Sequence, residues 1–166
     1  MNSAKATEDD FVSMVSAQQL LIKKICRLYA FTDDERQDLF QEIVLQLWKA
    51  FPSFRQESLV TTWLYRVALN TAITYRRREQ KHRTSDVSLP DQQILDNGEE
   101  KEQVRMLYQT IGKLNKIDKA LVFLHLEGYN YREISGLSGL TETNVATKLS
   151  RIRKHLAKEM EKIYSK

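Results

Sequence analysis

The 166-residue sequence is poor in cysteine, proline and glycine, with one, two and five of them. A single cysteine excludes an internal disulfide, and the apolar stretch around Cys26 predicts a buried structural thiol. So few helix-breaking residues, in a chain that is 42% hydrophobic and 29% charged, are typical of a helical protein. No apolar run reaches about 18 residues, so no transmembrane helix is expected. The acidic start at residues 8–10 does not resemble a secretory signal, and together these features favour the cytoplasm.

The residues that catalysis or metal binding needs are also scarce. His82, His125 and His155 are scattered, without the spacing of metal ligands. The acidic run at residues 33–35 is better explained as the start of a helix than as a metal site. We therefore expect no catalytic residues, no metal, no cofactor and no small-molecule substrate, which makes an enzyme such as a nuclease or recombinase a poor fit.

The net charge of +4 conceals an alternating pattern along the chain. Residues 55–84 contain seven Lys or Arg and two Asp or Glu, and residues 104–166 contain twelve and six. Between them, residues 85–103 contain one Lys and six acidic residues. Solvated helix faces would explain either basic block alone. Two basic blocks around an acidic spacer favour a protein that contacts a phosphate backbone at two places.

Hydrophobic periodicity predicts helices and no strand of useful length. Residues 8–30 predict one or two amphipathic helices, whose apolar positions at three- and four-residue steps are Phe11, Val15, Leu20, Leu21, Ile25 and Leu28. Thr32 predicts the N-cap of a helix that Pro52 ends. A loop at 53–60 precedes a helical run from Trp63 to Tyr75 that becomes basic. Residues 84–100 lose periodicity and predict a linker. The expected fold is all-α, with two small helical domains joined by a flexible acidic linker.

The C-terminal part predicts a helix-turn-helix. Helices are expected over Val104–Leu114 and over Asp118–Leu126, where Leu121, Val122, Leu124 and Leu126 should face inward. Gly128 should end the second of these helices in a left-handed conformation. Ile134 and Leu137 should then face Val145 and Leu149 across a turn at Gly139, and Thr141 should cap the last helix.

The outward face of that last helix has the composition of a DNA-reading surface. Thr and Asn side chains read base edges, and Lys and Arg bind phosphates or guanine. The residues expected there are Thr143, Asn144, Thr147, Lys148 and Arg151, followed by Arg153 and Lys154. A plain helical hairpin is the alternative. The turn glycine, the cap and the polar outer face together favour DNA binding.

An aromatic and basic segment lies in the first half of the chain. Trp63, Tyr65 and Arg66 precede the cluster of residues 76–78, which is three consecutive arginines. Aromatic rings stack on unpaired bases and a basic rim follows the strand, so this composition suits single-stranded DNA. Core packing is the alternative for Trp63 and Tyr65, and we favour it for Trp63.

With these motifs in view, the chain from about residue 8 to 160 resembles the bacterial sigma-70 family, in its two-domain extracytoplasmic-function (ECF) group. Residues 38–51 resemble the helix that binds core polymerase. Residues 54–55 and 62–70 resemble the promoter-melting and −10 region, and the helix-turn-helix resembles the −35 region. The sequence departs from the usual pattern at Leu59, Thr74, Asn115, Gly136 and Ala146.

The resemblance implies a domain organisation and three sets of site residues. It implies sigma region 2 over residues 8–84, a linker over 85–103 and sigma region 4 over 104–162. The core-polymerase set is Asp38, Gln41, Glu42, Leu45, Gln46 and Trp48. The −10 set is Phe54, Arg55, Thr62, Trp63, Arg66, Asn70, Arg76, Arg77 and Arg78, and residues 53–60 would hold a flipped-out base. The −35 set is Arg132, Thr141, Thr143, Asn144, Thr147, Lys148, Arg151, Arg153 and Lys154.

The implied partners are core RNA polymerase, through its largest-subunit clamp helices and its β flap, promoter DNA, and an anti-sigma factor. A sigma factor binds DNA as a monomer with polymerase. A stand-alone helix-turn-helix regulator remains the alternative, which should dimerise on a palindrome. It explains residues 104–166 but leaves residues 38–78 without a role. The acidic linker is a further hypothesis, as an autoinhibitory segment lying against the basic parts.

Overall fold

The computed structural model describes residues 7–82 and 102–165, and for residues 76–82 it describes the backbone only. Within these ranges the chain forms α-helices and one 3-10 helix and no strand, which confirms the all-α prediction there. The elements are α1 (Glu8–Ala17), α2 (Gln19–Tyr29), α3 (Asp33–Ala50), η1 (Phe51–Ser53), α4 (Val60–His82), α5 (Glu102–Gly112), α6 (Lys116–Leu126), α7 (Tyr131–Ser138) and α8 (Glu142–Tyr164). No described helix combines the length and the apolarity that a membrane crossing requires.

Contacts divide the chain into two units, Met1–Gln93 and Ile94–Lys166. The first contains α1 to α4 and the second contains α5 to α8. Nearly all of the predicted acidic linker, and with it the autoinhibition hypothesis, lies outside the described residues.

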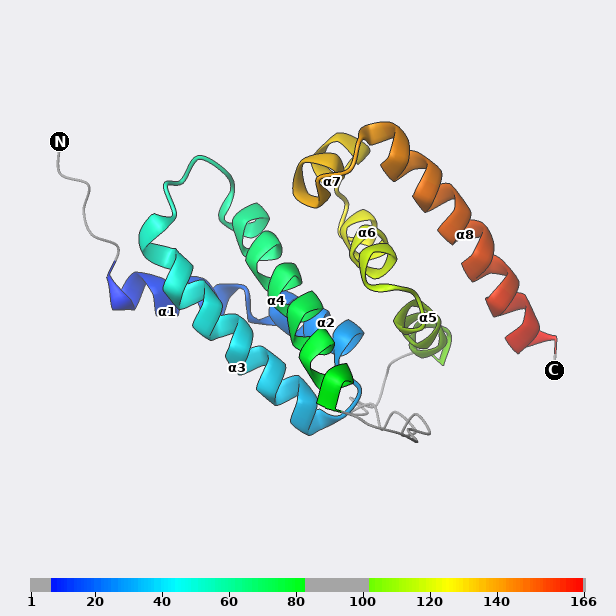
Figure 1. The fold of residues 1–166 in the computed structure, drawn as a ribbon, viewed down its shortest axis with the longest axis horizontal. Coiled ribbons are helices and arrows are strands. Elements are labelled where there is room, and N and C mark those ends of the chain that lie inside the picture. Colours follow the sequence, from blue (N-terminus) through cyan, green and yellow to red (C-terminus); the bar gives the residue numbers. More distant parts are fainter. Residues whose placement is uncertain (1–6, 83–101, 166) are drawn as a thin grey trace. The chain divides into compact units, whose positions relative to one another are not determined.

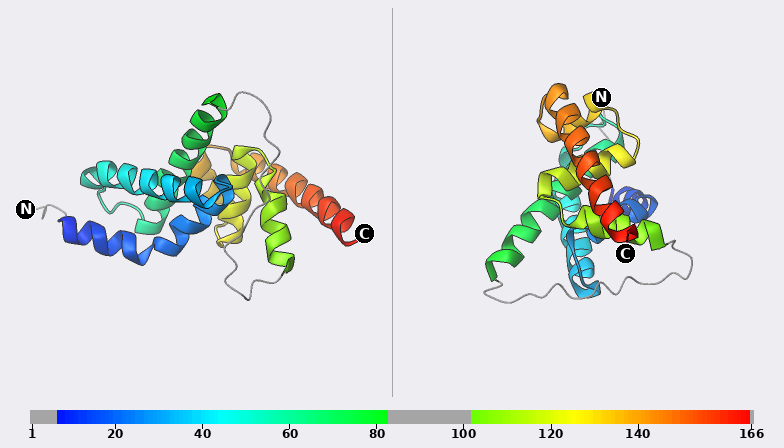
Figure 2. Two further views of the ribbon diagram at one scale, coloured as in Figure 1. Left: turned by 90° about the horizontal axis from the view of Figure 1, so that it is seen from below. Right: turned by 90° about the vertical axis from the view of Figure 1, so that its right-hand side faces the viewer.

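In the first unit, α2, α3 and α4 pack on one another, and α3 lies side by side with α4 (Figure 1). Leu39, Ile43 and Leu47 recur every four residues along α3 and are fully buried, which places one stripe of this helix against its neighbours. Figure 2 shows α1 and α2 as consecutive segments, and the break between them falls at Gln18. Cys26 on α2 is 2% exposed, which confirms the predicted buried thiol.

The ends of α3 follow from local chemistry. Thr32 is its N-cap, and the Thr32 hydroxyl accepts a hydrogen bond from the backbone N–H of Glu35 at 3.2 Å, as predicted. The α-helix stops at Ala50, before Pro52. Phe51 nevertheless keeps helical dihedrals, φ −57° and ψ −41°, because it begins the 3-10 turn of η1 instead of the extended segment expected before a proline.

The second unit is built around a core that α6, α7 and α8 share. Leu121 and Leu124 from α6, Ile134 from α7 and Val145 from α8 are at most 2% exposed. Both predicted glycine turns are confirmed, with φ +92° at Gly128 and φ +75° at Gly139. At Gly139 this conformation ends α7 and redirects the chain into α8.

Two expectations about inward-facing leucines are wrong. Leu126 is 61% exposed, because it lies in the last turn of α6, and Phe123 is buried in the same helix instead. Leu20 is 76% exposed, while Ile22 and Ile25 supply the buried face of α2. Both leucines lie near a helix end. The apolar pattern of the sequence continues there, but no neighbouring helix in the described part of the chain extends far enough to cover the side chain.

Candidate nucleic-acid interface

Four of the six residues of the core-polymerase set lie on the side of α3 away from its buried stripe. Asp38, Gln41, Leu45 and Trp48 are exposed, the last two at 44% each. At 3.6 residues per turn these four side chains fall within an arc of about 80°. The surface therefore combines one carboxylate and one amide with two large apolar groups, a composition suited to docking another protein.

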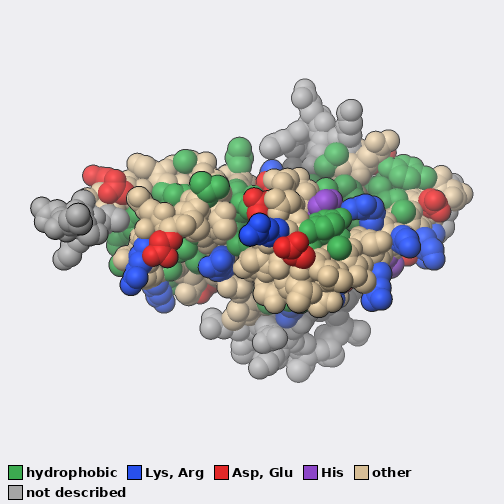
Figure 3. Space-filling model, turned by 90° about the horizontal axis from the view of Figure 1, so that it is seen from above, with side chains coloured by type: hydrophobic (Ala, Val, Ile, Leu, Met, Phe, Trp, Pro, Cys, Tyr) green, Lys and Arg blue, Asp and Glu red, His purple; other side chains and the backbone are tan. Residues whose placement is uncertain are grey.

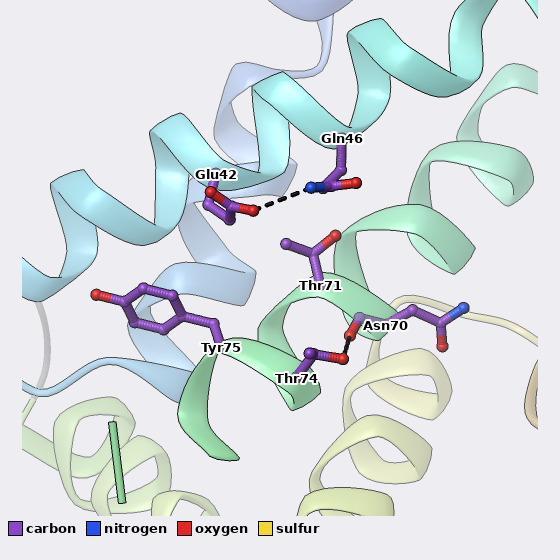
Figure 4. Close-up of a pocket in the computed structure, with 6 residues that line it drawn as sticks. All are labelled: Glu42, Gln46, Asn70, Thr71, Thr74 and Tyr75. Atoms are coloured by element: carbon purple, nitrogen blue, oxygen red, sulfur yellow. Dashed lines mark hydrogen bonds between the residues drawn. The ribbon is translucent and has the colours of Figure 1, made fainter. Parts of the chain in front are cut away.

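Glu42 and Gln46, the other two members of the set, are half-buried at the edge of α3 that faces α4. The Gln46 side-chain amide donates a hydrogen bond to Glu42 Oε1 at 3.0 Å. These two residues line a pocket of about 280 Å³ together with Asn70, Thr71, Thr74 and Tyr75 of α4 (Figure 4). The pocket thus brings two residues of the core-polymerase set beside Asn70 of the −10 set.

An aromatic cluster connects α1, α3, η1 and α4. The Phe11 ring meets the Trp48 ring edge-on at a centroid distance of 4.9 Å and the Phe51 ring at 5.2 Å. The centroids of the Phe51 and Trp63 rings are 6.4 Å apart. The centroids of the Trp63 and Phe54 rings are 4.8 Å apart, and their planes are inclined by 36°. Edge-to-face and tilted pairs at these separations are favourable. Trp48 and Trp63, which belong to two different site sets, are therefore connected by a continuous series of aromatic contacts.

Three residues of the −10 set share the outer face of α4. Trp63, Arg66 and Asn70 fall within an arc of about 60° at helical spacing. Arg66 and Asn70 are exposed, whereas Trp63 is half-buried and Tyr65 is fully buried. Tyr65 therefore belongs to the core, and Trp63 combines partial core packing with partial exposure. The side chains of Arg76, Arg77 and Arg78 lie outside the description, although their backbone continues α4.

The loop before α4 carries the rest of the −10 set. Phe54 is half-buried under Trp63, Arg55 is exposed, and Thr62 is half-buried in the first turn of α4. Gln56 has a φ of +56°, the left-handed region that residues other than glycine rarely adopt. Such strain persists where the surrounding structure imposes it, and it occurs often at binding loops.

The helix-turn-helix is organised by side-chain caps. Thr141 accepts a hydrogen bond from the backbone N–H of Asn144 at 3.2 Å, so the structure uses this member of the −35 set as the N-cap of α8. Asn130 caps α7 with Glu133 in a reciprocal capping box. The Ser135 hydroxyl and the Leu140 carbonyl hydrogen-bond across the turn. These contacts fix where α8 begins.

Five residues of the −35 set lie together on the outer face of α8. At helical spacing they fall within an arc of about 100°, and all are exposed: Thr143, Asn144, Thr147, Arg151 and Lys154. Figure 3 shows Lys and Arg side chains recurring along the part of the molecular surface where α8 runs. The face combines side chains that read base edges with cations that bind phosphates.

The remaining members of the −35 set lie elsewhere. Arg153 is exposed on the flank of α8 about 200° around the helix from Arg151. Arg132 is exposed on α7 and lines a pocket of about 450 Å³ with Glu142 and four residues of the α6–α7 connection and its flanks. Lys148 is at the edge of the outer face, and its ammonium lies 3.8 Å from Asp118 Oδ1 of α6.

Sequence reasoning missed two residues that shape this interface. Asn115 caps α6, since its side-chain oxygen accepts a hydrogen bond from the backbone N–H of Asp118 at 2.9 Å. Its position before an apolar periodic run was the available signal. Asp118 was expected only as the start of a helix, and nothing indicated its contact with Lys148, because that partner is 30 residues away and only the fold brings the two together.

Comparison with protein-family models gives two matches that follow one another along the chain. Residues 14–82 match sigma-70 region 2, and residues 105–156 match sigma-70 region 4. Together these matches cover most of the chain and include α2 to α4 and most of α5 to α8.

Several curated proteins and solved structures are similar over most of their length. The ECF RNA polymerase sigma-E factor of Haemophilus influenzae is 25% identical, over 91% of this chain and 87% of its own. The RNA polymerase sigma factor YlaC of Bacillus subtilis is 29% identical, over 75% and 77%. Among structures, the sigma factor RpoE of Bartonella quintana, in complex with the anti-sigma factor NepR, has a TM-score of 0.71 at 17% identity, over 92% of this chain and 97% of that one. CnrH, in complex with the cytosolic domain of CnrY, has a TM-score of 0.67 at 17% identity, over 93% and 90%.

Proposed function

The chain belongs to the sigma-70 family, in its ECF group, and we propose that it is a sigma factor that brings core RNA polymerase to a set of promoters and helps to melt them. The observation that carries this proposal is the presence in one chain of three surfaces in family order: the outer faces of α3, α4 and α8. A stand-alone regulator would leave the first two without a use. In this proposal the protein is a transcription initiation factor and catalyses no reaction itself. It acts in the cytoplasm, where the chromosome and RNA polymerase are located.

The proposed division of labour follows the two units. Residues 8–84 bind polymerase and the −10 element, and residues 104–162 bind the −35 element and the β flap of polymerase. Residues 85–103 are the linker between these two domains. The outer face of α3 docks on the clamp helices of the largest subunit. Its exposed Leu45 and Trp48 supply the apolar area, and Asp38 and Gln41 supply polar contacts.

The −10 element is held by α4 and the loop before it. As the strands separate, unpaired bases stack on the partly exposed Trp63 ring, and Arg66 and Asn70 lie on the same face of α4 to contact the strand. Residues 53–60 take a flipped-out base beside Phe54. The three arginines at 76–78, which follow this face in the sequence, are proposed to contact phosphates of the same element.

The −35 element is read by α8 in the major groove. Thr143, Asn144 and Thr147 reach base edges, and Arg151 and Lys154 contact phosphates on the same face. Arg132 and Arg153 contact the flanking backbone. Because the protein binds DNA as a monomer together with polymerase, its single α8 helix reads one −35 element, and that DNA site need not be palindromic.

An anti-sigma factor is the other proposed partner, because a sigma factor with exposed polymerase- and DNA-binding faces needs restraint when its promoters are not required. The two similar structures above were each solved as a complex with another protein, NepR in one case an anti-sigma factor. Such a partner would cover the exposed faces of α3 and α8.

The polymerase surface is tested by a matched pair of leucine substitutions. Leu45→Arg places a charge in the centre of the proposed docking face and should weaken binding to core polymerase by roughly tenfold or more. Leu20→Arg alters a leucine that is more exposed, at 76% against 44%, but lies on α2 outside that face. It should leave the affinity unchanged. Equal affinities for both variants, measured by titration of labelled protein with core enzyme, would reject this docking surface.

A further inference from the structure

Asp118 occupies an unusual position behind the DNA-reading helix. It lies in the first turn of α6, where its Oδ2 accepts a hydrogen bond from the Asn115 side-chain amide at 2.9 Å. Its Oδ1 is buried and accepts no hydrogen bond from any described residue. The Lys148 ammonium lies 3.8 Å from that oxygen. The carboxylate thus has one oxygen fixed by the cap of α6 and the other directed at α8.

Lys148 is placed to serve either of two anionic partners. On α8 it follows Asn144 by one turn and lies about 60° around the helix from Arg151, at the edge of the reading face nearest to the core. Its side chain is 42% exposed, and that of Asp118 is 19% exposed. The ammonium can therefore still reach solvent, but it extends toward α6 and not outward with Arg151 and Lys154.

The distance and exposure indicate a loose pair. At 3.8 Å the contact is longer than a hydrogen bond, so it is a charge interaction without fixed geometry. Pairs of this kind, partly open to water, contribute little to folding stability. Such a pair can still affect DNA binding. A lysine ammonium that is partly neutralised by a neighbouring carboxylate gains less binding free energy from a DNA phosphate than an unpaired lysine does.

We propose that Asp118 is a positioning residue for DNA binding, which competes with DNA phosphates for Lys148 and so limits the sequence-independent affinity of α8. This inference rests on the proposed function, since it assumes that α8 binds duplex DNA. Lys148 adds to the contact only to the extent that Asp118 releases it. Base-edge contacts from Thr143, Asn144 and Thr147 are unaffected, so restraining one cation raises the relative weight of sequence reading.

The test measures how binding of the full-length protein to a non-promoter duplex depends on salt. Each phosphate contact adds about 0.9 to the slope of log K against log salt. Asp118→Asn should tighten binding about two- to fivefold at low salt and steepen the slope by up to about 0.9. Adding Lys148→Met should abolish both changes. Glu161→Gln is the control, because it removes one acidic charge from the same helix about 20 Å along from Lys148, beyond the screening length of about 10 Å.

Three outcomes would overturn the inference. These are an unchanged slope in Asp118→Asn, a steeper slope that persists without Lys148, and an equal change in Glu161→Gln. A purely structural role would lower the melting temperature of Asp118→Asn and leave the slope unaltered. If Asp118→Asn does not fold, Asp118→Ser replaces it, and its slope with and without Lys148→Met decides in the same way. Transcription with core polymerase that persists beside an unchanged slope would reject this inference and leave the proposed function intact.

Discussion

Two glycines of the helix-turn-helix have opposite requirements, although they are only three residues apart. Gly136 lies inside α7 with helical dihedrals, and a Cβ added there would meet no atom within 4 Å. Gly139 has equally open space but a φ of +75°, which side chains rarely tolerate. Alanine loses less backbone entropy than glycine on folding, whereas alanine at positive φ is strained.

We predict that Gly136→Ala raises the free energy of unfolding of the second unit by about 0.5–1 kcal/mol. Gly139→Ala should lower it by about 1 kcal/mol or more. Thermal unfolding should be followed by circular dichroism, because both tryptophans of the chain, Trp48 and Trp63, lie in the first unit and their fluorescence does not report on the second. Destabilisation by both substitutions would show that Gly136 has a packing role that the structure does not contain.

The Cys26 thiol gives a second prediction at this scale. Burial raises the pKa of Cys26 from 9.0 to about 12, because the thiolate would lose its hydration. The unfolded chain keeps the lower value and loses the proton first. The contribution of this group to stability is therefore complete below pH 9.0 and is lost as the pH rises toward 12.

Near neutral pH the folded protein should consequently react with a disulfide reagent such as DTNB more than about tenfold more slowly than the same protein in urea. Equal rates, followed by absorbance of the released thiolate, would contradict a buried thiol. Cys26→Ser, which lacks the reactive group, is the control for release from any other source.

At the scale of elements, the start of α6 depends on one side chain. The side-chain oxygen of Asn115 accepts a hydrogen bond from the backbone N–H of Asp118, and the side-chain NH2 of Asn115 donates one to the Asp118 carboxylate. Asn115 is one of the positions at which the sequence departs from the usual family pattern. The side-chain cap gives this residue a local structural role at the start of α6.

Asn115→Ala should lower the free energy of unfolding of the second unit by about 0.5–2 kcal/mol, since the cap is lost. Asn115→Ser retains a capping oxygen and should cost only a few tenths of a kcal/mol. Urea denaturation followed by circular dichroism measures both. A loss in the serine variant as large as in the alanine variant would assign the effect to the contact with the Asp118 carboxylate instead of the cap.

The helices and their caps could be predicted from the sequence because they depend on local signals. The Thr32 and Thr141 caps, the turns at Gly128 and Gly139, and the buried positions of Ile134, Val145 and Leu149 are confirmed. The errors at Leu20 and Leu126 arise where covering neighbours end, which periodicity does not encode.

Contacts between distant segments were not predictable in this way. The Phe11–Trp48 contact and the Asp118–Lys148 pair join residues 37 and 30 positions apart. Nothing in the residues themselves specifies such a partner, since any of several acids or rings would have fitted the same pattern. That residues at helical spacing would share one helix face was predictable, whereas the contacts that orient these residues became visible only in the fold.

At the scale of the whole molecule, each unit has its own buried core. Leu39, Ile43 and Leu64 belong to the first, and Leu121, Ile134 and Val145 belong to the second. We propose that each folds without the other. Residues 1–84 and 102–166, expressed as separate polypeptides, should each unfold cooperatively by circular dichroism and calorimetry. A fragment that is helical only in the presence of the other would contradict independent cores.

The central claim, that this chain is a sigma factor, is tested most directly by run-off transcription with purified core RNA polymerase, this protein and fragmented genomic DNA from its source. We predict discrete transcripts that appear only when polymerase and protein are both present, with start sites downstream of a shared pair of −35 and −10 sequences. Leu45→Arg should abolish these transcripts, and Leu20→Arg should preserve them. No specific transcript, together with no binding to core polymerase, would contradict the account and leave a stand-alone DNA-binding regulator as the better explanation.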